Sequence, residues 1–380
     1  MINRSHISDI LCCLFLVLLL VACGTPSKPV TASGGDMEVP PSSTSTHAHP
    51  SPTSISPTPS PIPPMPTHTH QPEAIVYLNP QRYFVEYIVR VSNDGFDLNE
   101  LQLYQPRPVE WDAQTDVEIE EISPTPSEEG EDPDHGNGMY LWKIMGDPKP
   151  GKSTTFTLRF TFTAYETRTN ISPEDIQPYD RSNPLYAMYT RPERFIEVSD
   201  PEIVALADQV VGAETNPYLI ARSFYDYVVD TAQYKLLGEG LAGAKSLCTG
   251  GTGECGDYSA LFVALCRAKG IPARPIVGYW AINGIDQTHV WAEFYVEPFG
   301  WVPVDPTIGQ FEPGKRDYYF GNMDNQRVIL NKGYNITLDP PGPDNFIASF
   351  LQVPLWWFWG SGDSDAMSIE RTRWRVEIAD

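Results

Sequence analysis

A long stretch rich in proline, serine and threonine limits where this chain can fold. Residues 24–73 contain thirteen prolines and no Phe, Trp or Tyr. A segment of this composition cannot bury enough apolar surface to offset the entropy lost on ordering it. We therefore predict a disordered stalk over residues 23–73, stiffened by its prolines. The folded part then begins near Ala74 and has about 300 residues, enough for two or three domains.

The N-terminus carries features of an export signal. Residues 10–22 form an uncharged run without Gly or Pro, which is too short to span a membrane and suits a signal peptide. The run ends in Leu20-Val21-Ala22-Cys23, which resembles a bacterial lipobox. The resemblance implies a signal peptide over residues 1–22 and acylation of Cys23, with palmitate among the acyl chains. The chain would then be a lipoprotein of the bacterial cell envelope, facing outside the cytoplasm; the alternative is an ordinary exported protein with an incidental cysteine.

The charge of the chain excludes two classes of partner. The formal net charge is −23 at pH 7. A field of that sign repels nucleic acid and anionic lipid surfaces. We therefore expect no nucleic-acid partner, and contact with a membrane only through the lipid anchor at Cys23. No feature of the sequence indicates an oligomeric state.

Residues 74–170 have the pattern of an all-β domain. Apolar side chains alternate with Thr and Arg in the run 155–163, TFTLRFTFT, and several similar runs are separated by turn-rich segments. This pattern predicts an N-terminal β-sandwich. The region has no cluster of charged or nucleophilic residues, so we expect it to serve in packing or binding.

Residues 171–335 show helices first and strands afterwards, which predicts an α+β domain with an antiparallel sheet. Capping and stop signals place helices over 200–212, from 216 to 227 or beyond, and over 254–269. Residues 336–380 contain short strands and the Trp-rich run PLWWFW. We expect this last segment to pack on the α+β core, with a sugar-binding platform as the alternative. The predicted strands of the core are RPIVGYWAI (274–282), HVWAEFYV (289–296) and WVPVD (301–305).

Three cysteines follow the stalk, Cys248, Cys255 and Cys266, and an odd number leaves at least one thiol unpaired within the chain. Cys255 lies between Gly253 and Gly256 at the expected start of a helix, where the helix dipole stabilises a thiolate. The glycines would let a substrate backbone approach the sulfur. A disulfide between Cys248 and Cys266 would leave Cys255 as the free thiol, although Cys266 could also be a core residue. Cys255 itself could be structural instead of reactive.

A reactive thiolate needs a general base and a group that orients the base. His289 opens one predicted strand and Asp305 closes the next. If residues 298–300 form the hairpin loop, Asp305 pairs opposite Glu293 and lies roughly 13 Å along the strand from His289. The two side chains can then meet only through a β-bulge or a loop centred nearer Glu297.

Three motifs in order resemble the core of the transglutaminase-like superfamily of papain-type cysteine enzymes. They are GTGECGDYSALFVALCRAKGIPARPIVGY, THVWAEFYV and GWVPVDPT, which together span about 55 residues. The resemblance implies a papain-like fold with a catalytic Cys255, His289 and Asp305. It also implies attack on a carboxamide or peptide carbonyl and a thioester intermediate, with no cofactor and no metal.

Acyl transfer also needs two donors for an oxyanion. The backbone N–H of Cys255 is the natural first donor, and Gln233 or Tyr234 are candidates for the second. We expect a surface-anchored peptidase or amidase that acts on protein or peptide substrates. One alternative is a protein-glutamine transamidase with an aromatic tunnel, for which Tyr279, Trp280, Trp291 and Trp301 are candidates. The other is a catalytically idle binding module of the cell envelope built on the same fold.

Overall fold

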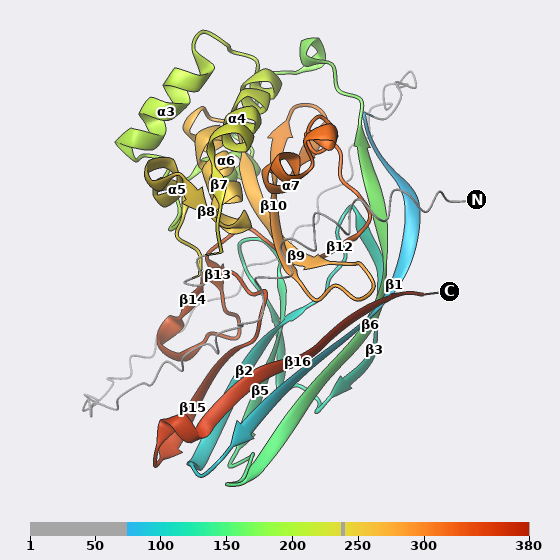
Figure 1. The fold of residues 1–380 in the computed structure, drawn as a ribbon, viewed down its shortest axis with the longest axis vertical. Coiled ribbons are helices and arrows are strands. Elements are labelled where there is room, and N and C mark those ends of the chain that lie inside the picture. The colour runs from blue at the N-terminus through green and yellow to red at the C-terminus, as the bar shows by residue number, and fades with distance from the viewer. Residues whose placement is uncertain (1–73, 237–239, 380) are drawn as a thin grey trace, which may run out of the picture.

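The computed structural model describes residues 74–236 and 240–379. Helices and a short antiparallel sheet form one half of the molecule, and long strands form the other (Figure 1). The α+β class and the β-sandwich predicted from the sequence are therefore confirmed. The predicted signal peptide, the acylated Cys23 and the predicted stalk lie outside the described residues.

The long strands form two four-stranded antiparallel sheets, in the orders β16-β1-β6-β3 and β15-β2-β5-β4. Their side chains meet in one apolar core. The first sheet contains β1 (Ile75–Asn93), β3 (Gln114–Ser123), β6 (Lys152–Thr169) and β16 (Met367–Ile378), and the second contains β2 (Asp97–Arg107), β4 (Glu128–Glu131), β5 (Gly138–Met145) and β15 (Leu355–Ser361).

Alternation of side chains explains the sandwich. In β6, Phe156, Leu158, Phe160 and Phe162 are buried, while Arg159 points to the outer face. The partner strand β1 has the same period, so successive side chains face opposite sides of the sheet. Apolar residues of the two strands therefore lie opposite one another on the inner face, as the Cα pairs Tyr83↔Phe162, Val85↔Phe160, Tyr87↔Leu158 and Val89↔Phe156.

The C-terminal segment differs from the expectation. Instead of packing only on the α+β core, its two long strands complete the sandwich: β15 pairs with β2, and β16 pairs with β1 along the edge of the other sheet (Figure 1). Trp374 and Val376 of β16 are buried in the sandwich core. The physical reason is that β1 and β2 would otherwise expose unpaired backbone edges. The sandwich is thus built from both ends of the described chain.

The other half is a four-stranded antiparallel sheet, in the order β11-β10-β9-β12, with helix α6 on one face. Residues 256–267 of α6 are buried because α3, α4, α5 and α7 surround the helix. The elements of this half are α2 (Pro184–Thr190), α3 (Pro201–Val211), α4 (Pro217–Thr231), β7 (Gln233–Tyr234), α5 (Ala244–Gly250), β8 (Thr252–Gly253), α6 (Cys255–Ala268), β9 (Ala273–Trp280), β10 (Thr288–Val296), β11 (Gly300–Val304), α7 (Pro306–Phe311) and β12 (Arg327–Lys332). The shorter connecting elements are η1 (Pro173–Asp175), η2 (Pro313–Lys315), β13 (Ile336–Thr337), η3 (Pro343–Asn345), β14 (Ile347–Ala348) and η4 (Ser364–Ala366).

The predicted helix boundaries agree with local capping contacts. The Asp200 side chain accepts a hydrogen bond from the Glu202 N–H at the start of α3, and Gly212 follows its end with φ 58°. Asn216 caps α4 in the same way. Gly270 has φ 73° just after α6, where a residue with a Cβ would be strained.

The sandwich and the α+β half share a buried boundary. Tyr279 of β9 stacks on Trp374 of β16, with ring centroids 4.0 Å apart. Two amide side chains from the sandwich half also bond the backbone of β12. Gln114 accepts from the Ile329 N–H (2.8 Å) and donates to the Ile329 carbonyl (3.0 Å). Asn137 makes the equivalent pair of bonds with the backbone of Lys332 (2.7 and 2.8 Å). The sandwich therefore holds β12 in place.

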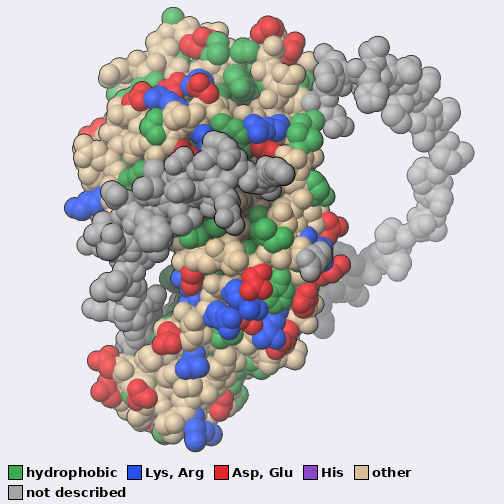
Figure 2. Space-filling view, turned by 45° about the vertical axis from the view of Figure 1, so that its right-hand side comes forward, with side chains coloured by type: hydrophobic (Ala, Val, Ile, Leu, Met, Phe, Trp, Pro, Cys, Tyr) green, Lys and Arg blue, Asp and Glu red, His purple; other side chains and the backbone are tan. Residues whose placement is uncertain are grey.

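The face shown in Figure 2 carries both acidic and basic side chains. Figure 2 shows Asp and Glu side chains over the upper and lower parts of the visible face, interspersed with Lys and Arg. Within residues 74–236 and 240–379, no helix combines the length and apolar character needed to cross a bilayer.

Candidate active site

Cys255 is the first residue of α6, and its position is fixed by a capping box. The Glu254 side chain accepts from the backbone at the third position of the helix, and the Asp257 side chain accepts from the Glu254 N–H (3.0 Å). Asp257 is buried and also accepts from the N–H groups of Ala242 and Gly243 (2.9 and 2.8 Å). These bonds hold the preceding loop against the helix start, so the half-buried Cys255 has little freedom to move.

The glycines flanking Cys255 serve a different purpose from the one expected. A Cβ on Gly253 would lie 2.8 Å from the Cβ of Asp257, and one on Gly256 would lie 2.9 Å from Leu241 Cδ1. Both glycines therefore allow tight internal packing at the helix start. Neither of them lines the cavity that contains Cys255.

His289 and Asp305 meet because the β10–β11 hairpin has a different register from the simplest prediction. Val296 pairs with Gly300 and Ala292 with Val304, so the loop is 297–299. Asp305, directly after β11, is then level with a residue two positions from His289, roughly 7 Å along the strand. This is the shift toward Glu297 that the sequence analysis required. The His289 Nε2 and Asp305 Oδ2 atoms lie 2.7 Å apart.

The carboxylate of Asp305 is fully buried and held at three points. Its Oδ2 atom lies against His289 Nε2 and accepts from Arg327 Nη1 (2.8 Å), and its Oδ1 atom accepts from the Ile308 N–H (3.0 Å). Burial alone would raise the pKa of Asp305, but the charges of His289 and Arg327 together with these hydrogen bonds lower it to about 2. Asp305 is therefore an anion at every physiological pH.

Two tryptophans orient the imidazole ring. His289 is stacked with Trp280 at 4.8 Å and with Trp291 at 6.0 Å between ring centroids, with interplanar angles of 19° and 21°. The His289 side chain is almost completely buried. Because Nε2 faces Asp305, the other ring nitrogen, Nδ1, is the one free to exchange a proton with a bound group.

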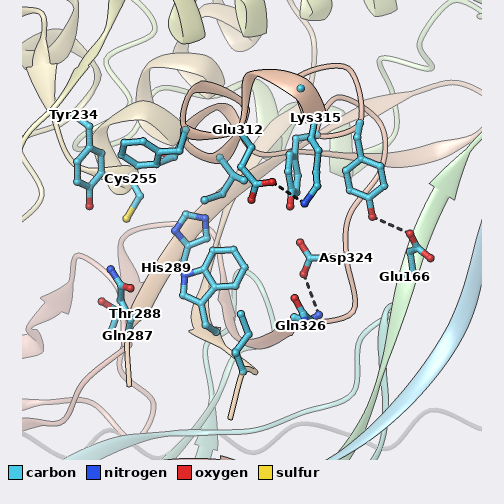
Figure 3. Close-up of a pocket in the computed structure, with 18 of the residues that line it drawn as sticks. Glu166, Tyr234, Cys255, Gln287, Thr288, His289, Glu312, Lys315, Asp324 and Gln326 are labelled. Carbon is cyan, nitrogen blue, oxygen red and sulfur yellow. Dashed lines mark hydrogen bonds and ion pairs between the residues drawn. The ribbon is translucent and has the colours of Figure 1, made fainter. Parts of the chain in front are cut away.

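Cys255 and His289 line one cavity of about 510 Å³. In Figure 3 the sulfur of Cys255 points into the cavity beside the His289 ring, with Tyr234 on its other side. The opposite end of the cavity is charged and polar, and Glu312 and Lys315 form an ion pair there (2.6 Å). The sandwich reaches this end, because Glu166 of β6 accepts from the Tyr318 hydroxyl (2.9 Å).

The Cys255 sulfur is a neutral thiol when no substrate is bound. Burial raises the pKa of the thiol, and the charges of Glu254 and Asp305 raise it further. The N–H groups of Val290 and Gly256 lower it, and the resulting pKa is about 12. The thiolate stabilisation that we expected from the helix start is thus outweighed by burial. A chemical role for Cys255 then requires a neighbouring base, and His289 is placed to act as one.

The two candidates for a second oxyanion donor differ. Tyr234 lines the cavity beside Cys255, and burial, followed by the charges of Cys255 and Glu254, raises the pKa of its phenol, so the hydroxyl remains a donor. Gln233 is exposed and does not line the cavity. Its backbone N–H already donates to the Gly251 carbonyl (2.8 Å). Tyr234 is therefore the better placed of the two candidates.

The disulfide considered between Cys248 and Cys266 is not formed, since both residues are free thiols. Cys266 lies inside α6 and is completely buried in the apolar core, while Cys248 is half-buried on α5. The alternative that Cys266 is a core residue is the one found, and the count of cysteines alone could not decide between the two because it gives no information on the distance between two helices.

Of the four aromatic residues considered for a tunnel, only Trp280 lines the cavity. Tyr279 packs in the sandwich core, Trp301 packs on Arg274, and Trp291 is buried behind His289. The other aromatic residues of the cavity wall lie outside the three sequence motifs. These are Tyr234, Phe311, Tyr318 and Tyr319.

Sequence reasoning also missed Arg327, the second partner of Asp305. It lies at the start of β12, outside the three motifs that indicated the site. The only signal was an Arg in the run YYFGNMDNQRV, and nothing local connects that residue with Asp305. Among the described residues there is no group of three or more His, Cys, Asp or Glu side chains suited to a metal ion.

The fold and site together define an α+β protein of the papain-like type, with a cysteine at a helix start and a buried histidine–aspartate pair on the adjoining sheet. Residues 204–306, which include Cys255, His289 and Asp305, match the model of the transglutaminase-like superfamily. A crystal structure from Cytophaga hutchinsonii, whose protein is named a "putative cysteine protease", has the same fold. It aligns with a TM-score of 0.57 and 17% identity, covering 80% of this chain and 92% of that one.

Two relatives by sequence are uncharacterised proteins. One, from Haemophilus influenzae, is 34% identical over 181 residues, which cover 37% of this chain and 49% of that protein. The other, from Mycobacterium tuberculosis, is 29% identical over 102 residues, which cover 23% of this chain and 29% of that protein. The matches thus span less than half of the length of either relative.

Proposed function

We propose that this protein is a cysteine-dependent acyl-transfer enzyme that hydrolyses amide bonds of proteins or peptides through a thioester. The observation that carries the proposal is the 2.7 Å contact between buried His289 and Asp305, next to a cavity that Cys255 also lines. A cysteine, a base and an orienting carboxylate in this order form the minimal set for nucleophilic catalysis by a thiol.

The first step forms the thioester. Nδ1 of His289 takes the proton of the Cys255 thiol while the sulfur attacks the carbonyl carbon of the substrate. The resulting oxyanion accepts hydrogen bonds from the Cys255 N–H, which has no intrahelical partner at the helix start, and from the Tyr234 hydroxyl. The C–N bond then breaks, and the leaving amine takes the proton from His289.

The second step releases the acid. His289 removes a proton from water, the resulting hydroxide attacks the thioester carbonyl, and the C–S bond breaks. The proton returns through His289 to the sulfur, and Cys255 is again a thiol. Asp305 stays ionised throughout, because its pKa lies near 2, and it stabilises the imidazolium that forms in each step.

The walls of the cavity favour water over an amine as the acceptor. Transfer to an amine requires a site that excludes water at ~55 M and positions the amine. Of the four tunnel candidates only Trp280 faces the cavity, and its other aromatic wall residues share the wall with the polar side chains of Gln287, Thr288 and Gln326. Transamidation is therefore the second candidate.

The test offers a glutamine-containing protein and a labelled primary amine to the purified full-length chain. Newly formed N-termini, released ammonia and incorporated label are followed together. We expect hydrolysis that Cys255→Ala abolishes and that Cys248→Ala, which changes a free thiol outside the cavity, leaves intact. Label incorporated in a Cys255-dependent manner without hydrolysis would establish the transamidase instead. Absence of hydrolysis and of incorporated label in both the wild type and Cys255→Ala would identify an idle binding module, and equal activity in both would show that Cys255 is not the nucleophile.

We further propose that the enzyme is anchored to the cell envelope through acylated Cys23. The lipobox-like run that ends at Cys23 supports this proposal. In a bacterial host, Cys23→Ser should move the protein from the membrane fraction to the soluble exported fraction. A membrane-bound Cys23→Ser variant would contradict it.

A further inference from the structure

We infer that Arg327 is a positioning residue of this active site, which holds the His289–Asp305 pair in its orientation and eases deprotonation of the Cys255 thiol. The inference rests on the proposed function, because it concerns the same site. It assigns a role to a side chain on β12, outside the three motifs that predicted the site.

Arg327 and His289 both contact the same oxygen atom, Oδ2 of Asp305. Nη1 of Arg327 donates to Asp305 Oδ2 at 2.8 Å, and Nε2 of His289 lies 2.7 Å from the same atom. The Ile308 N–H occupies Oδ1. The carboxylate therefore cannot rotate without losing at least one of three contacts, and the imidazole that depends on it is held in one plane.

The guanidinium is itself fixed from two further sides. Asp324 accepts from Arg327 Nη2 at 3.0 Å and from Nε at 3.3 Å. The guanidinium carbon lies 4.6 Å from the ring centroid of Trp280 and 4.9 Å from that of Trp291. These two rings also stack with His289. Arg327 is thus bound to the same carboxylate and the same indole rings as the general base.

The sandwich contributes to this arrangement. The bonds from Gln114 and Asn137 to the backbone of Ile329 and Lys332 fix β12 two and five residues beyond Arg327. Both amide side chains are buried. The sandwich therefore affects the site through β12, as well as through Glu166 in the cavity wall.

Charges of opposite sign follow one another through these contacts, since Arg327 is paired with Asp305 on one side and with Asp324 on the other. A cation close to an ionisable group favours its deprotonated form, and an anion favours its protonated form. Arg327 therefore makes deprotonation of the site easier, and Asp324 makes it harder. The low pKa of Asp305 agrees with this, and burial does not discharge Arg327, whose pKa is raised by Asp324 and Asp305. The other titratable groups that face Asp305 or Arg327 are Cys255 on α6, Tyr225 on α4, and Tyr319 after η2.

The test measures how fast iodoacetamide alkylates Cys255 at several pH values between 6 and 10, in the full-length protein. Peptide mass spectrometry separates Cys255 from the other cysteines, and no substrate is needed. Arg327→Met should slow the alkylation of Cys255 several-fold at each pH, shifting the rate profile upward by about one pH unit at most. Asp324→Asn, which keeps Arg327 in place, should shift the profile in the opposite direction. Arg327→Lys should lie between Arg327→Met and the wild type, because lysine keeps the positive charge but lacks the guanidinium nitrogens that bond Asp305 and Asp324 at the same time.

The matched control is Arg267→Met. Arg267 is also a buried guanidinium paired with a carboxylate, that of Glu193 (2.9 Å), but it lies near the other end of α6. We expect Arg267→Met to lower thermal stability and leave the alkylation profile of Cys255 unchanged. If Arg327 had a purely structural role, Arg327→Met would likewise lower thermal stability and leave the alkylation profile of Cys255 unchanged.

Opposite shifts in Arg327→Met and Asp324→Asn support the inference. An unchanged profile in folded Arg327→Met overturns it. If Arg327→Met does not fold, a folded Asp324→Asn with the wild-type profile overturns it equally. These outcomes are separate from the proposed function, which fails only in the hydrolysis assay with Cys255→Ala.

Discussion

Replacing Asp305 by Asn removes one charge and one acceptor from the buried centre of the site. The carboxylate uses Oδ2 for His289 and Arg327, and Oδ1 for the Ile308 N–H. An amide has one oxygen. If that oxygen faces Ile308, the NH₂ group meets the donors of His289 and Arg327, and if it is turned around, the NH₂ group meets the Ile308 N–H. Asn therefore cannot satisfy all three contacts.

The expected loss of stability follows from the pKa and from the partner left behind. The pKa of Asp305 is about 2 instead of 3.8. A shift of this size corresponds to about 2 kcal/mol of folding free energy at neutral pH. Breaking a buried ion pair costs ~3–5 kcal/mol, and Arg327 keeps Asp324, so the lower end applies. We expect the free energy of unfolding to fall by about 3 kcal/mol and kcat/KM to fall about a thousandfold, because the imidazole loses its fixed orientation.

The pH dependence provides a second measurement. The depressed pKa of Asp305 means that its stabilisation is complete above pH ~4, the value of an unfolded Asp, and is lost as the pH falls toward 2. Urea unfolding at pH 7, 5, 3.5 and 2.5 should show a shallower acid slope in Asp305→Asn. The control is Asp317→Asn, which removes an exposed partner of Arg222 and should change stability by less than about 1 kcal/mol. A change below about 0.5 kcal/mol at pH 7 in Asp305→Asn, with the acid slope retained, would refute the reasoning.

The remaining predictions concern single side chains. Cys255→Ala should abolish hydrolysis with little change in melting temperature, because the half-buried thiol leaves a small cavity; equal loss of both would indicate a structural cysteine. His289→Ala should cost nearly as much activity, and near-wild-type rates would exclude it as the base. Tyr234→Phe should lower kcat about a hundredfold, and exposed Gln233→Ala should not; the same rate in both would remove the hydroxyl from the oxyanion site. Trp374→Ala should cost ~3 kcal/mol of stability, measured by urea unfolding, since it removes the stack on Tyr279.

The three longer helices, α3, α4 and α6, and their boundaries could be predicted because their signals are local, whereas the shorter α2, α5 and α7 were not predicted. Asp200, Asn216 and Glu254 make capping contacts within three residues along the chain, and Gly270 accepts a left-handed backbone at the end of α6. A contact of that kind depends on neighbouring residues and hardly on the rest of the fold. The alternation in β6 was readable for the same reason, since its period is visible in the strand itself.

The site could be predicted only in part. The order of the three motifs brought Cys255, His289 and Asp305 to attention, but the hairpin register that joins the last two depends on which loop closes between Val296 and Gly300. Two registers differing by two residues keep the same faces of both strands buried, so the hydrophobic pattern cannot distinguish them. The contact with Asp305 distinguishes them in the folded protein.

The sequence by itself determined the three longer helices, the separation into a sandwich and an α+β core, and the residues that carry the candidate chemistry. The tertiary structure decided the rest, because it depends on contacts between residues far apart in the chain. It placed β15 and β16 in the sandwich, kept Cys248 and Cys266 apart as free thiols, and raised the pKa of Cys255 through burial. It also brought Arg327 to Asp305 through the pairing of β12 with β9. Burial and long-range pairing are properties of the packed chain, and no local pattern of residues encodes them.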